Sequence, residues 1–164
     1  MTTALSNEGG TTPDQNPPQQ RNWNIDDYAA HLGVPVEELH QFQITHIWRN
    51  SQSVVSIPYF DPTGNEVISV RYRSPDQHFW RKNDKAILYC QQQLSEAQIK
   101  QHVWLVEGES DCLILNIHGQ PAVGISGANN WDENRDAHLF DDIETIYVVI
   151  ECEENGEPDN GGQA

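Results

Sequence analysis

The sequence predicts an α+β fold: a small helical pair and a β-hairpin region, followed by a partial α/β parallel sheet. Three observations lead to this class. Apolar residues recur at helical spacing between positions 25 and 42, alternate at strand spacing between positions 53 and 73, and then form short continuous runs separated by helical segments. Continuous runs are typical of strands buried on both faces, as in a parallel sheet covered by helices.

The length and composition set the size of this fold. With 164 residues, 37% of them hydrophobic, the chain has room for one compact domain, or for one small domain and part of another. Residues 1–22 are rich in Thr, Asn, Gln, Gly and Pro, so we expect a disordered leader there. We expect a helical pair plus a β-rich subdomain at 23–101 and a partial α/β domain at 102–164. Because a doubly wound sheet of three strands is unusually small, we also expect the chain to be C-terminally truncated.

Two short helices are predicted first. Asn24 can cap the first helix, and Gly33 ends it. Pro35 indicates the start of the second. The apolar faces are Ile25, Tyr28, Ala29 and Leu32 in the first helix, and Val36, Leu39 and Phe42 in the second. Both helices can therefore bury one side.

A β-hairpin is predicted next, with a strand from Ser53 to Tyr59, a turn at 61–64 and a returning strand from Glu66 to Arg73. Alternation along the returning strand puts Arg71 and Arg73 on one face. Phe79–Lys82 and Ile87–Cys90 are expected to be further short strands.

The second half is predicted to alternate between helices and strands. Ser95 and Gln98 fit a capping box for a helix ending near Gln101. The elements expected after it are a strand Val103–Val106, a helix from about Glu109 to His118 closed by Gly119, a strand Ala122–Ile125, a helix around Asp136–Ile143 and a strand Ile146–Ile150. The three apolar strands would form the parallel sheet.

Charge is distributed unevenly along the chain. The 25 acidic and 9 basic side chains give a formal charge of −16, which argues against a protein that coats nucleic acid by bulk electrostatics. However, five basic residues fall within 15 positions, whereas residues 101–164 hold 14 acidic groups and Arg135 alone. The five are Arg71, Arg73, Arg81, Lys82 and Lys85, hereafter the basic strip. The strip could hold a phosphate backbone beside an acidic pocket, with Tyr72, Phe79 and Trp80 stacking on bases, or it could pair internally with the acidic half.

Several classes of protein are excluded. No apolar run is long enough to span a membrane and no signal peptide is evident, so we expect a cytoplasmic protein without a membrane partner. Three widely spaced cysteines and scattered histidines provide neither a disulfide framework nor a zinc site. Dinucleotide and P-loop fingerprints are missing as well.

Carboxylates gather where two of the predicted strands end. Glu107 follows the first strand of the parallel sheet, and residues 151–159 after the last strand are strongly acidic. Because ligands bind beyond the carboxyl ends of parallel strands, these groups could hold Mg²⁺ for phosphoryl or nucleotidyl transfer. The alternative is a solvated acidic tail and a surface glutamate.

The segment Val106-Glu107-Gly108-Glu109-Ser110-Asp111 is followed by a helix, a strand and Gly127, and then by an apolar strand with an acidic end. This pattern resembles the Toprim domain. Bacterial-type DNA primases, phage primase-helicases, type IA and II topoisomerases and some nucleases share that domain. Glu107, Gly108 and Asp111 match its Glu-Gly-x-x-Asp motif. Its Asp-x-Asp-x-x-Gly motif has two possible registers here, which we leave open: Glu151, Glu153 and Gly156, or Glu157, Asp159 and Gly162.

Residues 57–73, with the basic strip, resemble the N-terminal subdomain of the primase RNA-polymerase core, where basic residues face template and nucleotide. The resemblance does not extend to the zinc module that usually precedes this core in the family. In total the resemblance spans roughly residues 25–162.

The resemblance implies a DNA primase-like Toprim protein that synthesises RNA primers in the replication of a phage, plasmid or mobile element. Glu107 would be the catalytic acid/base, and the expected ligands of Mg²⁺ or Mn²⁺ are Glu107, Glu151, Glu153, Glu157 and Asp159. Expected partners are single-stranded DNA, nucleoside triphosphates and a replicative helicase or fused helicase segment. The alternatives are a Toprim nuclease and a truncated, non-catalytic nucleic-acid-binding module.

Overall fold

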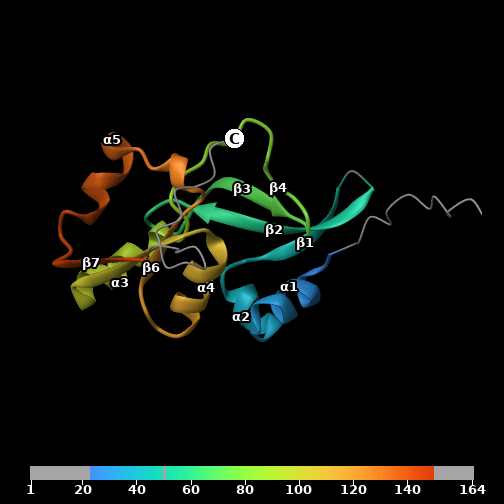
Figure 1. The fold of residues 1–164 in the computed structure, drawn as a ribbon, viewed down its shortest axis with the longest axis horizontal. Coiled ribbons are helices and arrows are strands. Elements are labelled where there is room, and N and C mark those ends of the chain that lie inside the picture. Colours follow the sequence, from blue (N-terminus) through green and yellow to red (C-terminus); the bar gives the residue numbers. More distant parts are fainter. Residues whose placement is uncertain (1–22, 50, 150–164) are drawn as a thin grey trace, which may run out of the picture.

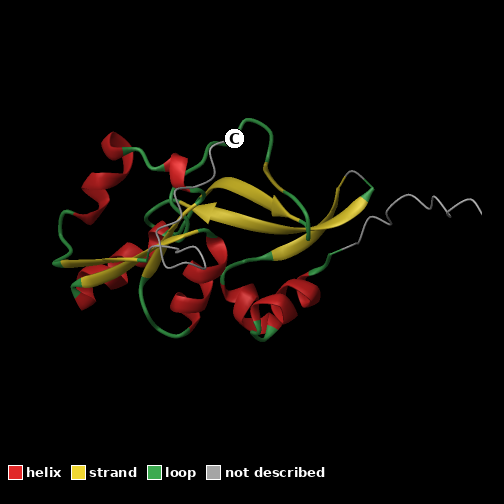
Figure 2. Ribbon diagram, viewed as in Figure 1, coloured by secondary structure: helices red, strands yellow, loops and turns green. Residues whose placement is uncertain are grey.

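A computed structural model describes the chain at residues 23–49 and 51–149. This part contains an antiparallel sheet with the strand order β1-β2-β3-β4 and a parallel sheet with the order β6-β5-β7 (Figures 1 and 2). The expected α+β class, a helical pair and hairpin region followed by a parallel sheet, is confirmed. The predicted leader at 1–22 and the acidic segment 151–159 lie outside the described residues.

The elements follow one another in two groups. The first group is α1 (Ile25–Leu32), α2 (Val36–Gln41), β1 (Thr45–Arg49), β2 (Gln52–Phe60), β3 (Val67–Arg73) and β4 (His78–Trp80). The second group is α3 (Leu94–Lys100), β5 (His102–Glu107), α4 (Glu109–Ile117), β6 (Ala122–Ile125), α5 (Glu133–Asp136) and β7 (Thr145–Val148).

The helical pair forms as the sequence predicts. Asn24 caps α1 in a reciprocal capping box with Asp27, each side chain accepting a hydrogen bond from the other residue's backbone at 3.0 Å. Gly33 ends α1 in the left-handed conformation, with φ 72°. α1 and α2 lie beside the antiparallel sheet (Figure 1).

The hairpin also forms, with an additional strand. Strand β1 pairs with β2 but has mostly exposed side chains, such as Trp48 at 68%, so it lacks the apolar pattern that would have predicted it. Strand β4 ends at Trp80 rather than Lys82, because a turn closed by the Asp84 amide and the Arg81 carbonyl begins there.

Three expected elements differ from the structure. Ile87–Cys90 makes only an isolated bridge, in which Tyr89 and Gly124 exchange backbone hydrogen bonds of 2.7 and 3.1 Å. The capping box at Ser95 is wrong, because α3 begins at Leu94 after a 3-10 turn and the Ser95 hydroxyl donates to the Gln92 carbonyl. The helix expected at 136–143 is replaced by α5 and a 3-10 turn at 137–140.

The early start of α5 has a local cause. The Asp132 side chain accepts hydrogen bonds from the backbone of Asn134 and Arg135, so it caps a helix that begins three residues before the predicted one. Phe140 and Ile143 are nevertheless buried, in the core that covers one face of the parallel sheet.

Helices cover both faces of the parallel sheet. Along β5, Trp104 and Val106 pack on the side of α4, and Val103 and Leu105 pack on the opposite side, against residues of α3. Strand β7 departs from the prediction, because its residues Ile146, Tyr147 and Val148 are 43–61% exposed. It lies at one edge of the described sheet, and none of these three side chains belongs to a buried cluster of the described residues, so its apolar run is not buried on both faces.

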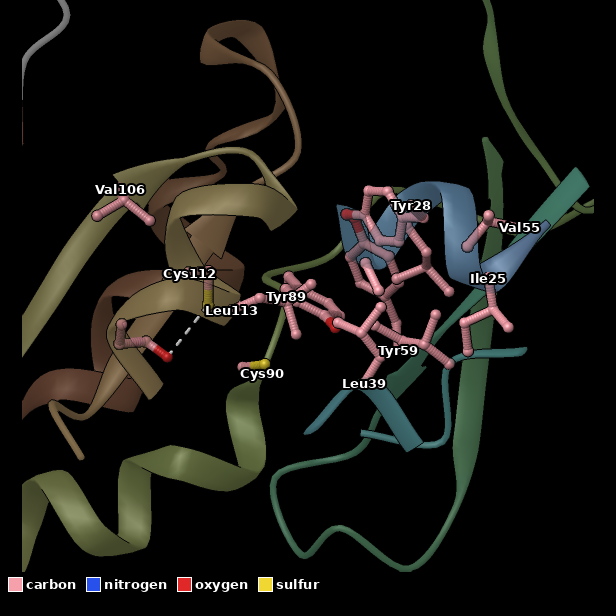
Figure 3. Close-up of a cluster of buried hydrophobic side chains, with 14 residues drawn as sticks. Ile25, Tyr28, Leu39, Val55, Tyr59, Tyr89, Cys90, Val106, Cys112 and Leu113 are labelled. Carbon is pink, nitrogen blue, oxygen red and sulfur yellow. Dashed lines mark hydrogen bonds between the residues drawn. The ribbon is translucent and has the colours of Figure 1, made fainter. Parts of the chain in front are cut away.

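One core joins the two parts of the chain. Tyr28 of α1, Leu39 of α2 and Tyr59 of β2 belong to the same cluster as Cys112 and Leu113 of α4 (Figure 3). In Figure 3, Tyr89 and Cys90 lie between the two groups. The boundary predicted near residue 101 stays a prediction, but the core is continuous across it. No helix in the described part of the chain is long and apolar enough to cross a membrane.

Candidate functional site

A pocket of about 290 Å³ lies between the two sheets. Its walls come from the end of β3, from His78, from the turn between β5 and α4, and from the residues that follow β6. It therefore opens at the carboxyl ends of parallel strands β5 and β6, the usual place for ligands on such a sheet.

Two glycines shape the turn that follows β5. Gly108 adopts φ 82°, and its amide donates to the Ile125 carbonyl at 2.7 Å. A Cβ atom on Gly124 would lie 2.4 Å from the Gly108 carbonyl oxygen, so β6 can approach the turn only with glycine at that position. Gly127, with φ 117°, also lines the pocket.

Exposed carboxylates stand at this turn. Glu107 and Asp111 line the pocket, and both residues are exposed. Within residues 23–49 and 51–149, no cluster of three or more His, Cys, Asp or Glu residues could hold a metal ion. The other predicted ligands, Glu151, Glu153, Glu157 and Asp159, lie outside the described residues.

Arginines form the opposite wall. Arg71 Nη1 lies 2.8 Å from Glu109 Oε1, in an ion pair whose side chains are only 12% and 6% exposed. The Tyr59 hydroxyl donates to the same carboxylate oxygen. Arg73 Nη1 donates to the Ser110 hydroxyl at 2.8 Å, and its guanidinium lies 5.4 Å from the centre of the Tyr28 ring.

The rest of the basic strip lies outside the pocket lining. Arg81 Nε pairs with Asp84 at 2.9 Å, whereas Lys82 and Lys85 are exposed. The structure therefore brings Arg71 and Arg73 to the predicted Glu107, and it separates them from the other three. Tyr72 is buried on the other face of the antiparallel sheet, against Phe79.

Three side chains in or next to the pocket have shifted pKa values. Burial, and then the neighbouring Glu109 carboxylate, raise the pKa of Tyr59 well above its ordinary value. Burial lowers the pKa of Arg71, but Glu109 and Tyr59 raise it by more, so its guanidinium stays charged. Partial burial and then the charge of Arg71 lower the pKa of His78, which favours the neutral imidazole in the pocket.

Sequence reasoning did not single out several of these residues. The sequence places Tyr59 in a strand and Glu109 at a variable position of the motif, and it gives neither a role in the site. No pattern in the sequence marks His78 or Ser126. One signal for Glu109 is available in the sequence: it is a second acidic residue two positions after Glu107, at the start of the predicted helix.

The fold is similar to that of the catalytic core of DnaG-type primases, as comparison with solved structures shows. The zinc-binding and RNA polymerase domains of the Aquifex aeolicus primase match with a TM-score of 0.63 and 16% identity, over 80% of this chain and 43% of that one. A DnaG primase catalytic domain bound to single-stranded DNA matches with a TM-score of 0.58 and 18% identity, over 87% and 57%.

The primase fragment of the bacteriophage T7 primase-helicase protein matches with a TM-score of 0.56 and 17% identity, over 93% of this chain and 72% of that one. The chain thus spans about half the length of the first two of these structures and more of the phage fragment. The sequence matches no protein-family model and no curated protein.

Proposed function

We propose that the chain is a primase-like Toprim protein that carries out nucleotidyl transfer, making RNA primers on single-stranded DNA in the replication of a phage, plasmid or mobile element. One observation carries the proposal: the exposed Glu107 carboxylate shares a pocket with Arg71 and Arg73 at the carboxyl ends of β5 and β6. The likeness of the fold to primase catalytic cores supports it.

The carboxylates of this pocket suit a divalent metal. Glu107 and Asp111 offer hard oxygen donors to solvent, and Mg²⁺ typically takes one or two carboxylates and keeps its other positions for water and phosphate. We propose Mg²⁺ or Mn²⁺, held by Glu107 together with acids among Glu151, Glu153, Glu157 and Asp159. The bound ion would neutralise the charge of the triphosphate.

The side chains of the pocket have distinct roles in the proposed reaction. A primer 3′-hydroxyl attacks the α-phosphorus of a nucleoside triphosphate, a new P–O bond forms and pyrophosphate leaves. Glu107 takes the proton from the attacking hydroxyl. Arg71 and Arg73 orient the phosphates through their guanidinium donors, which match phosphate oxygens in geometry and charge.

The proposed partners follow from the same arrangement. Single-stranded DNA is the template, and the exposed Lys82 and Lys85 are available for its backbone phosphates. A helicase is the proposed protein partner, because one similar structure is the primase fragment of a primase-helicase. A cytoplasmic location stays a prediction.

Primer synthesis tests the proposed function. Purified protein is incubated with single-stranded DNA, radiolabelled nucleotides and Mg²⁺ or Mn²⁺. Glu107→Gln should reduce primer synthesis by about 10²-fold or more, which is the usual contribution of a positioned acid/base group. The matched control is Glu37→Gln, at an exposed position in α2 far along the chain from the pocket.

Each result decides between the candidate functions. Full activity in Glu107→Gln would overturn its assigned role. Nicking of plasmid DNA without nucleotides would favour the nuclease. DNA binding without synthesis or cleavage would favour a non-catalytic module. Calorimetric titration of Mn²⁺ into the wild type and Glu107→Ala would test metal binding directly, with weaker binding expected in the variant.

A further inference from the structure

Glu109 has an unusual setting for a carboxylate that lines the pocket. It is the first residue of α4, two positions after Glu107, yet its side chain is only 6% exposed. Its Oε1 atom accepts hydrogen bonds from both Arg71 Nη1 and the Tyr59 hydroxyl. Glu109 therefore faces the antiparallel sheet, whereas Glu107 is exposed to solvent.

A buried ion pair of this kind needs a compensating arrangement. Removing two charges from water costs more than their attraction returns unless the geometry is good and further hydrogen bonds are made. Tyr59 supplies such a bond, and the carbonyl of Ser126 lies 3.4 Å from Arg71 Nη1. The ring of Trp80 lies under the guanidinium, with 5.4 Å from Arg71 Cζ to the ring centre. The side chain of Arg71 is thus fixed by contacts on several sides.

Arg71 still has hydrogen-bonding capacity. Its Nε atom is buried, and among residues 23–49 and 51–149 it has no hydrogen-bond partner. The hydroxyl of Ser126, which also lines the pocket, is likewise buried without a partner in the described chain. Buried donors of this kind are normally satisfied, so two unused donors at one pocket indicate that a ligand supplies the acceptors.

We propose that Glu109 is a positioning residue, whose carboxylate holds Arg71 so that its free donors face the phosphates of a nucleoside triphosphate in the pocket. This inference rests on the proposed function, because it requires the pocket to take a nucleotide. Glu109 acts through Arg71 and does not touch the substrate. The pair also connects α4 to β3, so the relative position of the two sheets sets the position of the arginine.

Two measurements test the proposal. The first is the nitrogen NMR signal of Arg71 Nε–H in the nucleotide-free protein, assigned by its loss in Arg71→Lys. Because the group is buried and fixed in the wild type, the signal should be distinct and exchange slowly with water. Glu109→Gln, which keeps the shape and removes the charge, should accelerate the exchange by about tenfold or more.

The second measurement is the affinity for Mg²⁺–ATP, determined by calorimetry. Glu109→Gln should weaken binding by about 5- to 20-fold, whereas Glu133→Gln, at the exposed first residue of α5, should leave it unchanged. In an Arg71→Met background, Glu109→Gln should have no further effect, because a residue that acts through Arg71 is not additive with it. Tyr59→Phe removes the hydrogen bond to Glu109 but keeps the ion pair, so it should weaken Mg²⁺–ATP binding by less than Glu109→Gln does. This variant tests the proposal even if Glu109→Gln does not fold.

The outcomes separate this inference from the proposed function. If the wild type does not bind Mg²⁺–ATP, the proposed function fails. If it binds, but Glu109→Gln or Tyr59→Phe leaves both the Arg71 signal and the affinity unchanged, the positioning role is overturned. The positioning role would also be overturned if Glu109→Gln lowered the affinity for Mg²⁺–ATP equally in the wild-type and the Arg71→Met backgrounds, because Glu109 would then act independently of Arg71.

Discussion

At the scale of the residue, the candidate site depends on a close contact between two glycines. Gly108 forms the turn that presents Glu107, and its carbonyl oxygen occupies the space where a Gly124 side chain would lie. The Gly124 amide and carbonyl also form the bridge to Tyr89. One residue without a side chain therefore allows β6 to contact both the turn that presents Glu107 and the segment that leads from the antiparallel sheet.

Gly124→Ala should lower the free energy of unfolding by about 3 kcal/mol, because a Cβ atom 2.4 Å from backbone oxygen forces the turn or the strand to move. Gly119→Ala is the matched control: its Cβ would meet nothing within 4 Å, and only its φ of 73° would be strained. We expect a loss of about 1 kcal/mol there. Urea denaturation measures both, and equal losses would contradict the steric role of Gly124.

At the scale of the element, the parallel strands differ in how deeply their side chains are buried. Val103 in β5 is fully buried in the core on one face of the parallel sheet, whereas Val148 in β7 is 61% exposed. Both lie in apolar runs that the sequence does not distinguish. Burial is decided by what packs on the faces of each strand, not by edge position. Strand β6 is also an edge strand of the described sheet, yet Ala122 and Val123 are fully buried because each belongs to one of the two cores that cover the sheet. None of the exposed β7 side chains belongs to a buried cluster of the described residues.

The same substitution at the two positions should therefore have different effects. Val103→Ala should lower the free energy of unfolding by about 2–3 kcal/mol, through lost burial and a cavity. Val148→Ala should change it by less than about 0.5 kcal/mol, as for most exposed positions. Chemical denaturation of the two variants compares them directly. A loss at Val148 as large as that at Val103 would mean that β7 is covered in the folded protein.

The spacing of apolar residues predicts the helices and strands that bury one face. It does not predict the structure of segments that depends on tertiary contacts. Asn24 and Gly33 bound α1 through interactions within a few residues, so the sequence locates that helix. The alternation that puts Arg71 and Arg73 on one face is equally local. By contrast, Ile87–Cys90 has the composition of a strand but meets a neighbour only at Tyr89.

The candidate site was predictable to a similar extent. The motif around Glu107 located the turn after β5, and the hairpin located the arginines. That Glu109 pairs with Arg71 depends on how the two sheets pack, which no local pattern encodes. Lys82 and Lys85 are exposed and lie outside the pocket lining because of the turn that ends β4, and the sequence pattern does not predict that turn either.

At the scale of the whole molecule, the shared core makes the two sheets interdependent. Tyr59 packs edge-on against Trp80 and tilted against Tyr89, with both ring centres 4.9 Å away. The same cluster reaches α2 through Leu39 and α4 through Leu113, both fully buried. A site with one wall from each sheet therefore keeps its geometry only while this core is intact.

Unfolding should accordingly be a single cooperative transition of the described region. Leu39→Ala and Leu113→Ala should each lower the free energy of unfolding by about 2–5 kcal/mol, the usual cost of emptying a buried leucine site. Because both side chains belong to one cluster, each variant should shift the whole transition, and scanning calorimetry should show one peak in every case. Two peaks, with Leu39→Ala moving one and Leu113→Ala the other, would mean that the halves fold independently. In that case the core would not fix the pocket between the halves. The position of Arg71 relative to Glu107 would then depend on polar contacts across the pocket, such as the Arg71–Glu109 ion pair and the Arg73–Ser110 hydrogen bond.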